Sequence, residues 1–234
     1  MTREELLVKA RFIQFPLSET TYSDYGNLSQ QALNRLRPPF PVYRLPLPGL
    51  GDMYKGWYLN ENHFTPKYHR KYVLPLLKDL LQIPYQEQDF DLIERTDQSG
   101  QFDLSYLKPR RVSCYSVIGL NRGEVYNSVQ FETLQESSSH DARTEYHQKY
   151  YKYAHQSSRL VNISLDSDRK LFISGDSQMI PDILTLATYF KEIWYIDNRS
   201  KLQLANIWSR YEFTDVLVEM YGSSLNTYLV DNFM

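Results

Sequence analysis

Two short stretches of the sequence carry residues that could together perform acyl transfer through a serine. Gly175-Asp176-Ser177 supplies a hydroxyl, and Glu61-Asn62-His63 supplies an imidazole with a carboxylate two residues before it. A serine hydroxyl is a weak nucleophile alone, so it needs a base within hydrogen-bond reach, and the base needs an acceptor that orients it. We interpret Ser177 as the nucleophile, His63 as the general base and Glu61 as the acidic member of a triad.

The elements around Ser177 predict a parallel sheet. An apolar run precedes the serine, and apolar residues recur at helical spacing after it, with Pro181 in the first turn, where proline is tolerated. Strands are predicted at 171–173, 193–196 and 216–218, and helices around 180–190 and 204–208. This β-α-β-α-β order requires right-handed crossovers between parallel strands, whose ligands collect at the carboxyl ends of the strands.

Three further residues are candidates at those strand ends. The N-terminus of the helix after Ser177 would present N–H groups to an oxyanion. Gly175, Asn198 and Arg199 are predicted by position to bind the oxyanion or the substrate, although Arg199 could instead pair with Asp197. Asp176 is expected to fix the turn through its own backbone.

The histidine block precedes a predicted helix. Thr65-Pro66 is a good helix opening, and apolar residues continue the helix toward Pro84. His69, near the start of this helix, is expected to be solvated. The five prolines between residues 38 and 48 exclude a long helix or a central strand and predict a wrap over the surface.

The middle of the chain predicts an edge hairpin and a polar segment. Residues 112–118 and 125–134 flank Asn121-Arg122-Gly123, as in an antiparallel hairpin added to the sheet edge. Residues 137–159 are nearly devoid of aliphatic side chains and predict an exposed helix or a lid.

These motifs resemble the SGNH/GDSL esterases and acyltransferases. Gly175-Asp176-Ser177 after an apolar strand is similar to their nucleophile block. Glu61-Asn62-His63-Phe64-Thr65 is similar to the Asp-x-His-Trp-Thr block of the SGNH-like alginate O-acetyltransferase group, in which the histidine block also precedes the serine block. Glu61 stands where that group has Asp, Phe64 stands where it has Trp, and the separate glycine and asparagine blocks of typical SGNH enzymes are not found.

The resemblance implies a fold and an activity. The fold would be a three-layer α/β/α sandwich with a mainly parallel sheet, and the activity would be O-acetylation of a surface polysaccharide. The acceptor would be a carbohydrate, the acyl donor acetyl-CoA or another acetyl ester, and no cofactor would be required. Partners in a polysaccharide-synthesis complex would follow. The 20 tyrosines, against 11 phenylalanines, weakly favour a sugar-like ligand.

Composition excludes several classes. A net charge of −2 argues against a nucleic-acid partner, and no apolar run approaches the roughly 18 residues of a membrane span. The single cysteine, Cys114, excludes an internal disulfide framework and a cysteine-rich metal site. No metal site is predicted: solvated histidines are commoner than a ligand set at His140, His147 and His155. No secretory signal is seen, which favours the cytoplasm, or export if a leader is missing.

The sequence therefore predicts one domain over residues 1–234, with a serine-dependent carbohydrate O-acyltransferase as the leading function. Its parts would be an irregular N-terminal wrap (1–60), the histidine block and helix (61–83), the hairpin and polar insertion (100–160) and the serine block (168–234). A carbohydrate acetylesterase of the same fold and a non-catalytic glycan-binding or assembly protein stay open. A nucleotide-dependent enzyme is disfavoured, because no Gly-x-Gly-x-x-Gly and no Walker loop is present.

Overall fold

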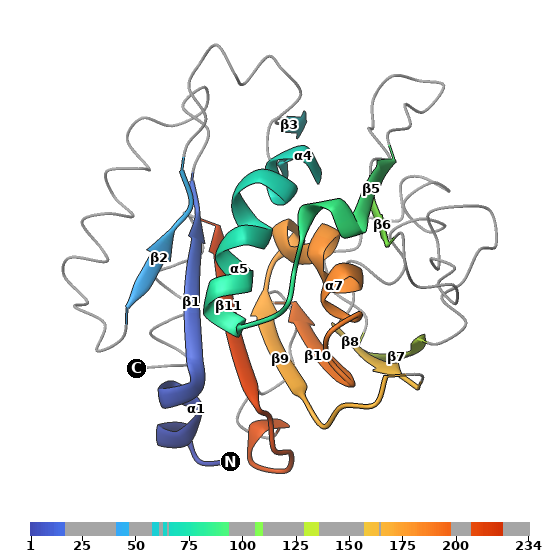
Figure 1. The fold of residues 1–234 in the computed structure, drawn as a ribbon. Coiled ribbons are helices and arrows are strands. Elements are labelled where there is room, and N and C mark those ends of the chain that lie inside the picture. The colour runs from blue at the N-terminus through green and yellow to red at the C-terminus, as the bar shows by residue number, and fades with distance from the viewer. Residues whose placement is uncertain are drawn as a thin grey trace.

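A mixed seven-stranded sheet organises the molecule (Figure 1). The computed structural model describes residues 1–16, 41–46, 58–60, 63–64, 66–93, 106–109, 129–135, 157–163, 165–197 and 207–221. The strand order is β2-β1-β11-β9-β10-β8-β7. The strands are β1 (Ala10–Phe15), β2 (Val42–Arg44), β7 (Val129–Gln135), β8 (Ser157–Asn162), β9 (Lys170–Gly175), β10 (Glu192–Asp197) and β11 (Asp215–Tyr221).

The strands from β2 to β10 in this order are parallel, whereas β8 runs antiparallel to β10 and β7 antiparallel to β8. Two small antiparallel sheets lie outside the main one. They pair β3 (Tyr58–Asn60) with β4 (His63–Phe64), and β5 (Phe90–Ile93) with β6 (Tyr106–Pro109).

Helices cover both faces of the main sheet. The first, α1 (Arg3–Lys9), begins at a capping box in which Thr2 and Glu5 exchange side-chain and backbone hydrogen bonds. The others are α4 (Pro66–Tyr68), the π-helical η2 (His69–Val73), α5 (Leu74–Leu81), the 3-10 turns η3 (Glu87–Asp89) and η4 (Ser177–Met179), and α7 (Ile180–Leu186). In Figure 1, α5 and α7 lie on the face of the sheet toward the viewer.

Two hydrophobic cores, one on each face, establish the predicted three-layer α/β/α architecture. Successive residues of β9 alternate between them, since Leu171 and Ile173 point to one side and Phe172 to the other. The core under α5 and α7 includes Ile13, Phe15, Leu74, Leu77, Leu81, Leu171, Ile173, Leu186, Ile193 and Leu217. The core on the α1 side includes Leu6, Ala10, Phe12, Phe172, Trp194, Ile196, Ile207, Trp208, Phe213, Val216 and Val218.

The start of the chain differs from the irregular wrap predicted for residues 1–60. The strand β1 lies inside the sheet, between β2 and β11. Phe12 and Ile13 point to opposite faces and are both fully buried. A strand covered on both faces does not alternate apolar and polar residues, so the sequence lacks the period-2 pattern by which a strand is usually predicted. In the proline-rich stretch, the described residues 41–46 contain the short edge strand β2, consistent with the exclusion of a central strand.

The edge of the sheet also differs from prediction. The strand β7 lies at the edge, but it pairs with β8. Its predicted hairpin partner, 112–118, lies outside the described residues. Residues 157–159 belong to β8 and not to an exposed polar segment, and Ser157 is fully buried. The first half of β8 is Ser-Ser-Arg, which gives little hydrophobic signal for a strand. The predicted polar segment therefore includes residues that belong to β8. Residues 137–156 lie outside the described part of the chain.

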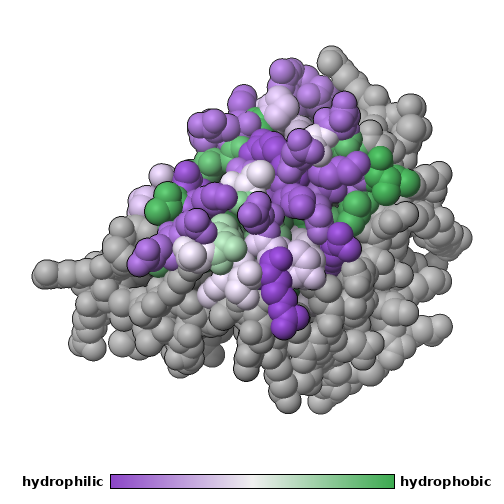
Figure 2. Space-filling view, turned by 90° about the horizontal axis from the view of Figure 1, so that it is seen from below, coloured by the Kyte–Doolittle hydropathy of each residue, from purple (hydrophilic) through white to green (hydrophobic). Residues whose placement is uncertain are grey.

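The face below the sheet in Figure 1, at the amino ends of the parallel strands, is shown in Figure 2. Its described surface is mainly hydrophilic, with small apolar areas between the polar ones. Small exposed apolar areas are normal on a folded protein. The candidate catalytic residues lie at the opposite end, where the parallel strands end.

Candidate active site at the carboxyl end of the sheet

The turn that carries Ser177 follows directly on the end of β9. Asp176 fixes this turn, as its position predicted: its Oδ1 accepts a hydrogen bond from the Gln178 N–H at 2.8 Å. The Asp176 carbonyl accepts from the Met179 N–H at 3.2 Å and from the Tyr195 hydroxyl at 2.9 Å. The N–H groups of Gln178 and Met179 are thus committed within the turn. An oxyanion would have to draw its donors from elsewhere, and not from these two.

Gly175 leaves space for a carboxyl group behind the turn. A Cβ at this position would lie 2.7 Å from Glu219 Oε2 and 3.2 Å from Glu219 Cβ. The first distance is too short for a non-bonded carbon–oxygen contact, so a larger residue fits only if the Glu219 side chain shifts. The Asp176 N–H donates to the same Glu219 Oε2 at 2.8 Å. Glycine in this motif is therefore required by the close approach of Glu219.

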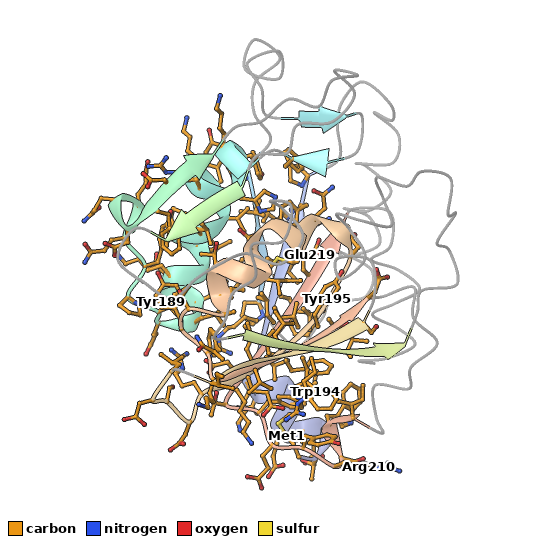
Figure 3. All side chains as sticks on the ribbon, turned by 90° about the vertical axis from the view of Figure 1, so that its right-hand side faces the viewer. Met1, Tyr189, Trp194, Tyr195, Arg210 and Glu219 are labelled. Carbon is orange, nitrogen blue, oxygen red and sulfur yellow. The ribbon has the colours of Figure 1, made fainter. Side chains whose placement is uncertain are left out.

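Glu219 is fully buried within β11. Burial raises the pKa of its carboxyl well above the ordinary value, and the negative charge of Asp176 raises it further, while the hydrogen bond from the Asp176 N–H acts in the opposite direction. In Figure 3, Glu219 lies beside α7, with Tyr195 below it. A buried, neutral carboxylic acid is the state that this environment favours.

The histidine block lies against the serine turn. The Phe64 N–H donates to Gln178 Oε1 at 3.2 Å, and Gln178 is 97% shielded, with 3% of its surface exposed. Phe64 follows His63, and Gln178 follows Ser177, so this bond holds the two predicted blocks side by side. Of His63 and Ser177 the structure describes the main chain.

Aromatic packing fixes the histidine block in place. The Phe64 ring is buried and stacks on Tyr68 at a centroid distance of 4.0 Å. The Tyr68 hydroxyl donates to the Pro46 carbonyl at 2.8 Å. Phe15 of β1 packs against both rings, at 5.9 and 6.4 Å. Phenylalanine at position 64 is thus a packing residue that anchors β4 above the carboxyl end of β1.

The end of β10 lies beside the end of β9. Asp197 is in register with Gly175 and is buried. Its N–H donates to the Ser157 hydroxyl of β8 at 3.1 Å. Asn198 and Arg199 follow Asp197 in the sequence, but these two residues and Glu61 lie outside the described part of the chain.

A buried histidine–carboxylate pair, which sequence reasoning missed, lies next to these blocks. His69 Nδ1 is 2.6 Å from Asp182 Oδ2, and both side chains are almost fully shielded. The prediction that His69 is solvated is therefore wrong. The sequence did hold a signal, because His69 precedes Val73, Leu77 and Leu81 at intervals of four, which places it on the buried face.

The His69–Asp182 pair ties together the helices that follow the two blocks. His69 opens the π-helical turn η2, and Asp182 lies in α7. Among the described residues, His69 Nε2 and Asp182 Oδ1 have no hydrogen-bond partner. The pair is a structural link with two polar atoms left over, and π-helical turns of this kind are frequent near functional sites.

Within the described part of the chain, no group of three or more His, Cys, Asp or Glu side chains is arranged to hold a metal ion. His140, His147 and His155 lie outside it. None of the helices in these same ranges is long and apolar enough to cross a membrane.

Comparisons with known proteins show similarity of fold. No protein family profile and no curated protein matches the chain. A solved DHHW family protein from Eubacterium siraeum has a TM-score of 0.60 and 14% identity over 99% of this chain and 85% of that one. Bacillus cereus PatB1 with a sulfonyl adduct has a TM-score of 0.61 and 14% identity, covering 96% and 83%. A second structure of Bacillus cereus PatB1 has a TM-score of 0.59 and 13% identity, covering 95% of this chain and 86% of that one. At these identities the chain shares the α/β fold of these proteins, and the likeness extends over nearly its whole length.

Proposed function

We propose that this protein is a serine-dependent carbohydrate O-acyltransferase that works through an acyl-enzyme on Ser177. The observation that carries the proposal is the hydrogen bond from the Phe64 N–H to Gln178 Oε1. These two residues are neighbours of His63 and Ser177, which are 114 positions apart in the sequence. A contact of this kind is what a nucleophile and base from distant segments require.

Two further facts support an activated nucleophile. The turn that follows β9 is held by Asp176 and Glu219, so the main chain at Ser177 is fixed before any substrate binds. The fold neighbour PatB1 is described with a sulfonyl adduct. A sulfonyl group becomes attached to a protein when a nucleophilic side chain attacks it, so this fold accommodates such a side chain. The carbohydrate acceptor rests on the resemblance of residues 61–65 to the alginate O-acetyltransferase block.

The mechanism follows from the assigned roles. His63 takes the proton from the Ser177 hydroxyl while the serine oxygen attacks the carbonyl carbon of an acetyl donor. The tetrahedral oxyanion collapses, the donor's leaving group takes the proton from His63, and Ser177 carries the acetyl group. Glu61 orients the imidazole. A sugar hydroxyl then gives its proton to His63 and attacks the acetyl-serine. The bond from the acetyl carbon to the serine oxygen breaks, and this oxygen takes the proton back from His63, which yields the acetylated sugar and free Ser177. Gly175, Asn198 and Arg199 are the candidates for contacts to the oxyanion or the substrate.

The acyl-enzyme can be tested directly. The protein is incubated with p-nitrophenyl acetate, and the intact mass and the peptide containing Ser177 are analysed. We expect one acetyl group on Ser177 or steady release of p-nitrophenol, and loss of both in Ser177→Ala and His63→Ala. Ser209→Ala is the matched control, because Ser209 is exposed near the start of β11, at the other end of the sheet. A folded wild-type protein that shows neither acylation nor turnover would exclude the mechanism.

Transfer and hydrolysis differ only in what attacks the acetyl-serine, so an acetylesterase is the alternative outcome of the same experiment. Oligosaccharides of different composition are added to the reaction, and the product sugars are analysed for an acetyl ester. An acetylated sugar that needs Ser177 supports transfer. Release of acetate at a rate that no oligosaccharide changes supports the esterase.

A further inference from the structure

Glu219 is a buried acid that the proposed mechanism does not use. Its carboxyl is buried in the layer between the sheet and α7, and Oε2 accepts the Asp176 N–H at 2.8 Å. The titratable side chains that face it are Asp176 in the serine turn and Asp182 in α7. Asp182 is paired with His69 of η2. The register partner on β1 is the apolar Ile13.

This environment sets a condition on the charge of Glu219. An ionised Glu219 would repel the Asp176 carboxylate, whose Oδ1 holds the Gln178 N–H. Burial in a low-dielectric layer strengthens such a repulsion. A neutral acid keeps the acceptor for the Asp176 N–H without opposing that bond. The negative charge of Asp176 therefore favours the protonated form of Glu219, against the smaller opposing effect of the Asp176 N–H bond.

We propose that Glu219 is a positioning residue for the Ser177 turn and that it performs this role as a neutral carboxylic acid. It contacts the turn from behind: Oε2 touches the space left by Gly175 and holds the N–H of Asp176. It acts on the nucleophile only through these two residues. The significance for catalysis rests on the proposed function, whereas the hydrogen bond and the proton do not.

The proton is tested by the pH dependence of stability. Glu219 binds a proton more tightly in the folded chain than in the unfolded one, so the stability it contributes is complete below the unfolded pKa of 4.5 and is lost as pH rises toward the folded value. Glu219→Gln keeps shape and neutrality but does not titrate. We expect the Tm of Glu219→Gln minus that of the wild type to increase as pH is raised from 4 to 8. Glu212→Gln, at an exposed position, controls for the removal of one acid. A difference that stays constant with pH would overturn the neutral-acid assignment.

The positioning role is tested by amide hydrogen exchange of the peptide that spans residues 175–179. Glu219→Ala removes the acceptor, and exchange at the Asp176 N–H should become about two- to tenfold faster, the factor that one intramolecular hydrogen bond supports. Glu219→Gln should exchange like the wild type. If the alanine variant does not fold, Glu219→Leu replaces it, because it fills the space without an acceptor. Unchanged exchange in the apolar variant that folds would overturn the positioning role.

Acylation of Ser177 then separates this inference from the proposed function. If Glu219 positions the turn, acetylation by p-nitrophenyl acetate should be slower by about tenfold or more in the apolar variant and restored in Glu219→Gln. Equal rates in all three proteins would refute the link to catalysis. A wild-type protein that is never acylated would refute the proposed function, while the exchange and stability results would still decide the state and contacts of Glu219.

Discussion

Loss of the Asp182 carboxylate should destabilise the protein far more than loss of a surface ion pair. Asp182→Ala leaves the buried His69 Nδ1 without its partner at 2.6 Å. Removal of one member of a buried pair costs about 3–5 kcal/mol. For a domain of this size each kcal/mol lowers Tm by about 2–4 °C. We therefore expect a decrease in Tm of about 6–20 °C, measured by circular dichroism or calorimetry.

A double-mutant cycle isolates the pair from the cavity that alanine creates. His69→Phe keeps a ring where His69 contacts Phe15, at a centroid distance of 5.5 Å. The double variant has neither polar group, so it should be more stable than the sum of the single effects predicts, with a coupling of up to about 3 kcal/mol. Additive single effects would refute the reasoning, because they would mean that the two side chains do not interact.

The neighbouring pair of Arg70 and Glu87 is the control. Arg70 Nε lies 3.0 Å from Glu87 Oε1, but 63% of the glutamate side chain is exposed. Exposed pairs contribute about 0.2–1 kcal/mol. Glu87→Ala should therefore lower Tm by no more than about 4 °C. An equal loss in Glu87→Ala and Asp182→Ala would show that burial does not set the strength of these pairs.

Three other changes test the region around the sheet. Gly175→Ala places a methyl group against a buried carboxyl and should cost about 1–3 kcal/mol, visible as a lower urea midpoint. An unchanged midpoint would mean that the Glu219 side chain makes room for the methyl group without cost. Burial raises the pKa of Glu192, but hydrogen bonds from Arg159 at 2.5 Å and from the Trp194 indole outweigh this effect and lower the pKa. The wild type should therefore be more stable than Glu192→Gln above pH 4.5, and this advantage should disappear as pH falls below that value. A constant advantage from pH 2.5 to 6 would contradict this. Gln178→Ala removes the acceptor for the Phe64 N–H and should slow acylation of Ser177 while Gln178→Glu restores it; full activity in the alanine variant would show that the bond does not align the two blocks.

The parallel sheet around Ser177 could be predicted because its signals are local. The run Leu171–Ile173 is apolar and is followed by a turn and a helical repeat, and the structure has β9, η4 and α7 there. The next two predicted strands are β10 and β11, and both are parallel to β9. Each of these elements is defined by residues close together in the sequence, so periodicity was sufficient.

The features that were missed depend on contacts between distant segments. The strand β1 pairs with β2 and with β11, which lies more than 200 residues later, and its own pattern does not alternate. The buried partner of His69 is Asp182 in α7, and no residue near His69 in the sequence indicates that this distant side chain pairs with it. For the site itself, sequence motifs predicted two blocks, and the structure adds the contact of Phe64 with Gln178 and the carboxyl of Glu219 behind the turn.

The position of β1 has a consequence for how the chain reaches its folded state. Among the described strands β1 is synthesised first, yet one of its two neighbours in the sheet, β11, ends at Tyr221. During synthesis β1 must wait with an open edge until nearly all of the described chain has emerged from the ribosome, and such long-range pairing folds slowly. An exposed edge attracts other strands in the meantime. Nascent chains of this protein are therefore expected to depend on chaperones until β11 pairs with β1 and β9.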